Sequence, residues 1–259
     1  MPGTPQPDPV DPAPPVNKVE TATIKQKGEL VAVGATSFVE LLPDGDILKR
    51  PFPSNIHGND RRREITTEAY VYDRLGPHRY LLQKKKWDPE TCSLTLEYMP
   101  NGTLADYLAA HPDVSLERRK QWAVEAAGCV QLLHLALIYH CDIGPQNFLL
   151  DDRLGLKIID FSGSSTDGSP TGIEPGFRYH DELSRGPSFK LDIFSLGSTM
   201  YFIMAGKHPF AELEDDEVIA RFRARDFPDL TDVPLASVIQ KCWSREVESV
   251  DDVINLLTV

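Results

Sequence analysis

The sequence predicts an α+β protein with two lobes, in which a five-stranded antiparallel sheet with one main helix precedes a mostly helical region. Two observations lead to this prediction. Short apolar or alternating runs, broken by glycine and proline, occupy the first hundred residues, whereas apolar residues after Pro100 recur at helical spacing. We therefore expect a small lobe over residues 23–99 and a larger lobe over residues 100–259.

The first 22 residues are expected to form a disordered tail. This segment is rich in proline and has few large apolar side chains, so burial cannot repay the entropy of ordering it. The whole chain has 259 residues, of which 41% are hydrophobic, and this is enough for a sizeable core.

Composition also argues against several classes of function. The formal net charge of −12 opposes binding to nucleic acid, because net repulsion from the phosphate backbone must be overcome first. No run of eighteen apolar residues occurs and the N-terminus is proline-rich, so we expect no membrane span, no secretory signal, and a cytoplasmic or nuclear location. The four cysteines lack C-x-x-C spacing, which indicates reduced thiols rather than a zinc site.

The elements of the small lobe follow from short runs of apolar residues. Strands are expected over residues 29–33, 37–42, 47–49, 80–85 and 93–98. One helix is expected over residues 60–75, and Gly76 and Pro77 end it. Its apolar residues share one face: Ile65, Ala69, Tyr72 and Leu75.

The larger lobe begins after the break at residues 100–102. Ser115 can cap a long helix whose apolar period continues to Leu137. Further helices are expected over residues 189–205, 215–225, 235–242 and 250–257.

The strongest functional signal is the stretch 140–150, which reads His-Cys-Asp-Ile-Gly-Pro-Gln-Asn-Phe-Leu-Leu. Asp142 is followed five positions later by Asn147, between a buried helix and an apolar strand. This spacing places two side chains suited to magnesium and hydroxyl groups on one loop. Thirteen residues after Asn147 comes Asp160, in the run Ile-Ile-Asp-Phe-Ser.

Together these two stretches resemble the catalytic loop and the Asp-Phe-Gly motif of eukaryotic protein kinases. Cys141 stands in place of the arginine of H-R-D-x-x-x-x-N, and Ser162 stands in place of the last glycine. The run from Lys190 to Gly197 resembles the D-x-W-S-x-G helix, whose aspartate, here Asp192, anchors the catalytic loop. The resemblance covers residues 27–257. The residues of the 140–150 stretch are most similar to those of divergent fungal kinase-like proteins.

The resemblance implies a nucleotide site between the lobes. Lys49 stands at the position of the nucleotide lysine and Glu68 at that of its partner, with Glu64 and a solvated helix face as the alternatives. The residues implied to surround the nucleotide are Gly34, Val39, Lys49, Leu96, Glu97 and Met99. Of these, Gly34 is the one glycine retained in the glycine-rich loop, and Glu97 and Met99 belong to the hinge.

The resemblance also implies a reaction. Lys49 would contact ATP phosphates, Asn147 and Asp160 would hold Mg²⁺, and Asp142 would orient the acceptor hydroxyl and take its proton. The expected activity is phosphoryl transfer from ATP to a protein substrate. Pro145 favours serine or threonine as the acceptor over tyrosine.

Several departures from the kinase pattern leave a pseudokinase, or a small-molecule kinase, as alternatives. Gly144 replaces the lysine that stabilises the transferring phosphate, and the compensating cation would have to be Arg178, Lys190 or part of the substrate. The resemblance implies a non-RD type, because Cys141 stands in place of the arginine, so switching through that arginine is not expected. In the segment between Asp160 and Lys190, Glu174 and Asp181 stand where kinases usually have threonine and glutamate, which weakens the case for peptide recognition. Hydroxyl groups in the stretch 164–171 are candidate phosphorylation sites.

Overall fold

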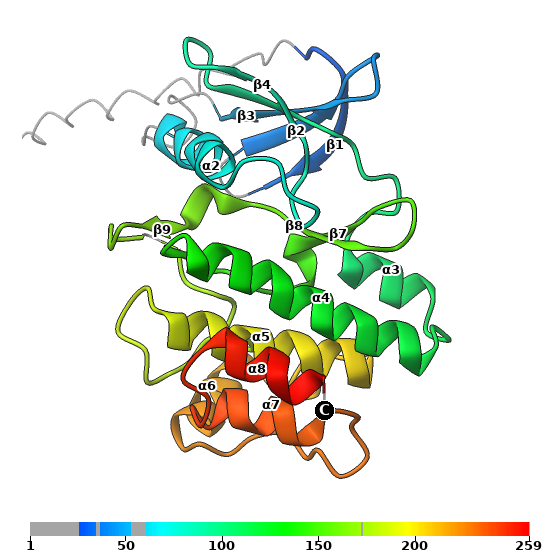
Figure 1. The fold of residues 1–259 in the computed structure, drawn as a ribbon, viewed down its shortest axis with the longest axis vertical. Helices are drawn as coiled ribbons and strands as arrows, with labels where there is room; N and C mark the ends of the chain where they lie inside the picture. Colours follow the sequence, from blue (N-terminus) through cyan, green and yellow to red (C-terminus); the bar gives the residue numbers. More distant parts are fainter. Residues whose placement is uncertain (1–25, 35–36, 53–60, 172, 259) are drawn as a thin grey trace, which may run out of the picture.

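The computed structural model describes residues 26–34, 37–52, 61–171 and 173–258, so the tail predicted at residues 1–22 lies outside the described part. The sheet and helix α2 form one lobe, and helices α3 to α8 form the other (Figure 1). Five antiparallel strands pair in the order β1-β2-β3-β5-β4. Their bounds are Glu29–Val33, Ser37–Leu41, Ile47–Pro51, Lys84–Asp88 for β4 and Ser93–Leu96 for β5. The predicted fold class is therefore confirmed.

The strand register decides which side chains point toward the cleft between the lobes. Val39 lies opposite Lys49, and Lys49 lies opposite Leu94. Directly opposed residues of antiparallel strands project from the same face of a sheet, so these three side chains form one row across β2, β3 and β5. The row places the Lys49 ammonium on the face that helix α2 covers.

Helix α2, Arg62–Leu75, packs one side against the sheet and ends at Gly76, whose φ of 67° favours glycine. Its buried residues are Ile65, Glu68, Ala69, Val71 and Tyr72. A carboxylate on this apolar face needs a charged partner, because an unpaired buried charge is strongly destabilising. Glu68 is thereby directed toward Lys49.

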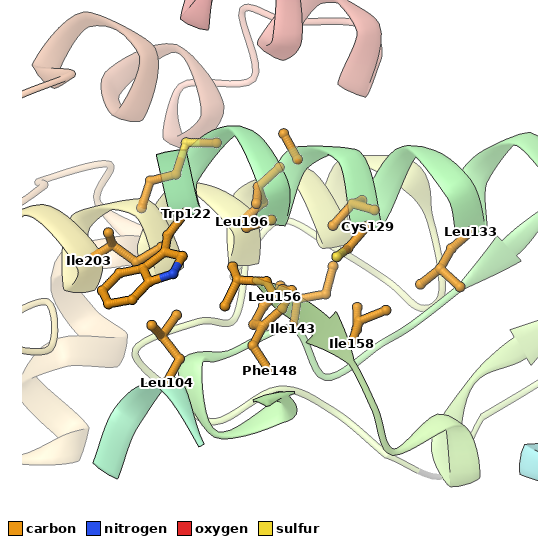
Figure 2. Close-up of a cluster of buried hydrophobic side chains, with 14 of the residues drawn as sticks. Leu104, Trp122, Cys129, Leu133, Ile143, Phe148, Leu156, Ile158, Leu196 and Ile203 are labelled. Atoms are coloured by element: carbon orange, nitrogen blue, oxygen red, sulfur yellow. The ribbon is translucent and has the colours of Figure 1, made fainter. Parts of the chain in front are cut away.

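The larger lobe is built on helix α4, Leu116–Leu135, and helix α5, Phe189–Ala205. Figure 2 shows an apolar cluster that includes Ile143 of the loop between β6 and β7, with Trp122 and Cys129 of α4 and Leu196 of α5. The Trp122 indole donates a hydrogen bond to the Leu154 carbonyl at 2.7 Å. The remaining helices are α3 (Leu104–Ala110), α6 (Asp215–Arg223), α7 (Ala236–Trp243) and α8 (Val250–Leu257).

Two small antiparallel pairs lie between α4 and α5 in the sequence and carry the motif residues. Strand β6 (Ile138–Tyr139) pairs with β9 (Ser165–Thr166), and β7 (Phe148–Leu150) pairs with β8 (Leu156–Ile158). Asp142 lies between β6 and β7, whereas Asp160 lies two residues after the end of β8. Both carboxylates therefore sit where the two lobes meet.

The fourth strand differs from its prediction over residues 80–85. The observed strand is Lys84–Asp88, and Leu81 and Leu82 precede it as buried loop residues. Tyr80 accepts a hydrogen bond from the Ile158 amide at 2.9 Å, so this apolar stretch packs against the larger lobe instead of joining the sheet. Periodicity cannot distinguish these two ways of burying leucine.

Helix α3 has no counterpart in the prediction. Its signal was nevertheless present, because the Thr103 hydroxyl accepts the Asp106 amide and caps the first turn. Within the described residues, no helix combines the length and apolar character needed to cross a membrane.

Candidate active site

Lys49 connects the two lobes through its ammonium group. The Nζ atom lies 2.6 Å from a Glu68 carboxylate oxygen and 2.6 Å from Asp160 Oδ1. Although burial acts to lower it, the charges of Glu68 and Asp160 raise the pKa of Lys49 above its usual value. The ammonium is therefore fixed as a cation between a helix and a loop that are far apart in the sequence.

The Asp160 carboxylate is held by two donors. Lys49 donates to Oδ1 at 2.6 Å, and the Ser162 hydroxyl donates to the same oxygen at 2.9 Å. Burial opposes ionisation, but Lys49 and these hydrogen bonds lower the pKa of Asp160 to about 2. Ser162, a departure from the kinase motif, thus adds a hydrogen bond that glycine could not make.

Asp142 and Asn147 are joined across their loop. The Asn147 amide donates to the Asp142 backbone carbonyl at 2.7 Å and to Asp142 Oδ2 at 2.9 Å. Burial raises the pKa of Asp142 above its ordinary value, and the nearby negative charge of Asp160 acts in the same direction. A carboxylate with a raised pKa is a better proton acceptor than an ordinary aspartate.

Asp192 anchors the start of the loop that carries Asp142 and Asn147, as predicted. Its carboxylate is buried in helix α5 and accepts the backbone amides of His140 at 2.9 Å and Cys141 at 3.0 Å. The His140 ring then bridges to the Asp160 strand, because its Nε2 donates to the Ile159 carbonyl at 2.9 Å. Cys141 is fully buried below the loop, where it is far less suited than arginine to bind an anion.

The residues predicted to surround the nucleotide lie along the lobe junction. Val39 is part of the row with Lys49, and Leu96 is buried at the end of β5. Met99, in the predicted hinge, is buried, and the Glu97 amide donates to the Gln83 carbonyl at 3.0 Å. Gly34 directly follows β1, and residues 35 and 36 of the predicted loop lie outside the described part.

Arg178 and Lys190 do not supply the cation that Gly144 lacks. Arg178 pairs with Asp215 at 2.6 Å, and Lys190 pairs with Glu248 at 2.8 Å. Each also donates to backbone carbonyls near its partner. Both cations thus serve to hold together parts of the larger lobe.

Asp181 has a structural role that the sequence motif only partly indicated. Its side chain is completely buried and lies 2.5 Å from Arg245 and 3.5 Å from Arg225. The two arginines come from segments 44 and 64 residues later, so no local pattern could identify them. Aspartate can therefore hold the end of this segment in place of the usual glutamate.

The pairing of Lys49 with Glu68 yields a prediction about the two candidate glutamates. The resemblance implies ATP as the ligand, and Glu68→Gln should then weaken its binding about tenfold, because the change removes a charge-assisted bond worth roughly 1.5 kcal/mol. Glu64→Gln should change binding less than about twofold, since Glu64 pairs with Arg61 at 3.2 Å near the surface. Titration of a fluorescent ATP analogue measures both effects, and a loss confined to Glu64→Gln would contradict the assignment.

Comparisons with known proteins agree with this geometry. Residues 49–257 match the model of the protein kinase domain. The chain is 26% identical over 213 residues to the cell cycle serine/threonine-protein kinase CDC5/MSD2 of Saccharomyces cerevisiae, covering 77% of this chain and 30% of that protein. It is 30% identical over 202 residues to wall-associated receptor kinase-like 3 of Arabidopsis thaliana, covering 71% of this chain and 27% of that one.

A third relative is the maternal embryonic leucine zipper kinase of Xenopus laevis, which is 30% identical over 150 residues, covering 52% of this chain and 22% of the relative. The chain thus spans less than a third of the length of each of these relatives. They come from a yeast, a plant and a frog, so they do not single out fungal proteins. The domain match covers most of the chain and includes Lys49, Asp142 and Asp160, and the chain therefore belongs to the protein kinase family.

Proposed function

We propose that this chain transfers the γ-phosphoryl group of ATP, with Mg²⁺, to serine or threonine hydroxyls of a protein substrate. The observation that carries the proposal is the Lys49 ammonium, held 2.6 Å from both Glu68 and Asp160 beside the Asp142–Asn147 pair. Phosphoryl transfer depends mainly on positioning and on compensating phosphate charge, and this arrangement supplies both. The names of the relatives support serine or threonine as the acceptor.

The residues present suit a magnesium–nucleotide complex. Mg²⁺ is commonly held by one or two protein side chains together with substrate phosphates, and Asp160 and Asn147 offer that number of oxygen ligands. Both bonds to Asp160 end on Oδ1, and within the described residues Oδ2 accepts none. The Asn147 amide nitrogen is committed to Asp142, which leaves the amide oxygen as its ligand atom. When bound, the metal neutralises charge on the phosphate oxygens.

Asp142 is the group that would act on the acceptor. Asn147 fixes one carboxylate oxygen, so the carboxylate has a defined orientation in which to receive the hydroxyl proton. Its raised pKa brings it closer to neutral pH, where such a base works best. Lys49 would contact the nucleotide phosphates, while Leu96, Glu97 and Met99 would face the base.

A pseudokinase is the second candidate, and a specific observation favours it. Gly144 leaves the loop without its cation, and Arg178 and Lys190 are engaged elsewhere. Such a chain would bind nucleotide or a protein partner without turnover. A cytoplasmic or nuclear location, the lack of a nucleic-acid partner and the kinship with divergent fungal kinase-like proteins stay proposals based on the sequence.

One experiment separates the two candidates. The melting temperature of the purified chain is measured with ATP, with Mg²⁺ and with both, and transfer of labelled γ-phosphate to a generic basic protein is then followed. An active kinase shows stabilisation that needs both ligands, and transfer above the background of Asp142→Asn. Stabilisation without transfer would favour the pseudokinase. The absence of both stabilisation and transfer would overturn the proposed nucleotide site.

The missing cation at Gly144 gives a prediction of increased activity. Gly144→Lys should raise kcat about threefold to tenfold with little change in ATP affinity, because the added charge acts on the transferring phosphate. The backbone allows this change, since φ is −168° and ψ is 163° at Gly144. The nearest atoms to an added Cβ belong to the flexible end of the Gln146 side chain, which can shift to make room.

The matched control for this prediction is Gly144→Met, which adds similar bulk without charge. Steady-state kinetics with ATP and a basic protein acceptor measure both variants. An equal change in kcat for the two variants would show that side-chain bulk, and not charge, is responsible.

A further inference from the structure

The charged groups around Asp142 and Asp160 are mostly negative. The Lys49 ammonium pairs with Glu68 and Asp160, and among the described residues no other lysine or arginine pairs with these two carboxylates or with Asp142. Burial and the charge of Asp160 both raise the pKa of Asp142, so the two carboxylates lie close enough to repel each other. One ammonium thus faces three carboxylates, and the phosphates of a nucleotide add further negative charge.

The His140 ring does not supply the missing positive charge. Its Nε2 donates to the Ile159 carbonyl at 2.9 Å, while its Nδ1 accepts the Asp142 amide at 3.3 Å. A ring that donates through one nitrogen and accepts through the other is the neutral form of histidine. The histidine therefore holds the loop without adding a cation to it.

The loop itself has an uncharged place next to Asp142. Gly144 lies two residues after Asp142 in an extended conformation, and the oxygen of the Gln146 side-chain amide would lie 2.5 Å from a Cβ added there. The Gln146 side chain is exposed and forms no hydrogen bond to the described residues. This part of the loop thus offers a free acceptor oxygen and space that a group from outside the chain can reach.

The geometry of an extended peptide shows which substrate residue would reach this place. Successive side chains of an extended chain point to opposite faces, so a residue two positions from the acceptor projects from the same face as the acceptor hydroxyl. The spacing between such residues is about 7 Å, at about 3.4 Å per residue. With the acceptor at Asp142, a residue two positions away comes to lie beside Gly144, which is itself two residues from Asp142.

We propose that the protein substrate carries an arginine two residues from its acceptor serine or threonine, and that this guanidinium offsets the charge of the transferring phosphoryl group beside Gly144. The acceptor oxygen forms a bond to the γ-phosphorus as the bond from that phosphorus to the β–γ bridging oxygen breaks. ADP leaves, Asp142 takes the hydroxyl proton, and the guanidinium keeps its protons throughout. This inference rests on the proposed function and names the substrate class of the same site.

Arginine fits this place better than lysine does. A guanidinium has five N–H donors in one plane, so it can donate to phosphate oxygens and to the Gln146 amide oxygen at the same time. An ammonium group is a compact charge that does not match two separated acceptors in this way. Because the guanidinium acts on charge that moves during transfer, its effect should appear in kcat and not only in KM.

The test uses the full chain and a set of peptides with one serine each, assayed by transfer of labelled phosphate. One pair of peptides has arginine or citrulline two residues before the serine, and a second pair has them two residues after it. Citrulline has the shape of arginine without its charge. In one of the two pairs, the arginine peptide should show a kcat about tenfold above that of its citrulline counterpart.

The control pair has arginine or citrulline five residues before the serine, a position on the opposite face of an extended peptide. It has the same net charge as the other pairs, so it reports general attraction of basic peptides to this acidic chain. Exchange of arginine for citrulline at this position should change KM, whereas kcat should stay within about twofold.

Gly144→Lys provides a second, independent readout. It should raise kcat for the citrulline peptide toward that of the arginine peptide, so that the ratio of the two falls to below about twofold, because one cation then replaces the other. Gly144→Met adds similar bulk without charge and should leave the ratio unchanged. The gain expected for Gly144→Lys with a basic protein is then an average over acceptors with and without a nearby arginine.

The outcomes separate this inference from the proposed function. Transfer to a generic basic protein, with equal kcat for arginine and citrulline at both near positions, would overturn the inference and leave the proposed function standing. An arginine effect of the same size in Gly144→Lys as in the unmodified chain would also overturn it, because the guanidinium would then act elsewhere. Transfer to neither the peptides nor the basic protein would refute the proposed function and the inference together.

Discussion

Asp142→Asn should reduce phosphoryl transfer at least about 10³-fold while leaving magnesium–ATP binding within about twofold of the unmodified chain. Asparagine cannot accept the hydroxyl proton, and the loss of a positioned base typically costs about 10² to 10⁴ in rate. The nucleotide would contact Lys49 and Asp160 instead of Asp142, so its affinity should persist. Labelled phosphate transfer and titration of an ATP analogue measure the two effects separately.

The structure suggests that this substitution keeps the fold of the loop. Asn147 also donates to the backbone carbonyl of residue 142, at 2.7 Å, and Asp192 holds the preceding amides. Asp152→Asn, an exposed change on the β7–β8 turn, is the control for loss of one negative charge. Equal transfer by Asp142→Asn and the unmodified chain would contradict the assignment of the base.

Asp160→Asn should abolish the dependence of ATP binding on magnesium. The carboxylate would be the main charged ligand of the metal, and its loss should lower affinity for the magnesium complex about 10²-fold. Binding of ATP without metal should change much less, or strengthen, because repulsion between Asp160 and phosphate disappears. Calorimetric titration with and without Mg²⁺ distinguishes these effects.

The same carboxylate also affects stability, because Lys49 and Ser162 both donate to it. The pKa of Asp160 in the folded chain, about 2, lies below its unfolded value. Its contribution to the free energy of unfolding is therefore present above the unfolded pKa and is lost as pH falls toward 2.

The matched control for Asp160→Asn is Ser162→Gly, which removes one hydrogen-bond donor to the carboxylate but keeps the carboxylate as a metal ligand. The proposed metal site would be contradicted if Mg²⁺ strengthened ATP binding by the same factor in Asp160→Asn as in Ser162→Gly.

Local patterns in the sequence account for most of the fold. The apolar spacing of helix α2 and its end at Gly76 place Glu68 on the buried face, and the alternation of β2 and β3 places Val39 and Lys49 together. The spacing of Asp142 and Asn147 needs only one short loop. Each of these features involves residues close in sequence, where helix and strand geometry fix the side-chain direction.

The sequence was less informative where burial could be achieved in two ways. Leu81 and Leu82 could be buried either within a strand or as loop residues. The structure shows the second arrangement, because this stretch packs against the larger lobe. Helix α3 is only seven residues long, so its period is too short to stand out from its surroundings.

By itself the sequence determined the two-lobed fold and the order of its motifs, whereas the choice of Glu68 over Glu64 as the partner of Lys49 came from the structure. The tertiary structure decided which distant groups meet: Asp181 with Arg225 and Arg245, and Arg178 with Asp215. The physical reason is that periodicity fixes the direction of a side chain within its element, whereas its charged partner depends on how separate elements pack.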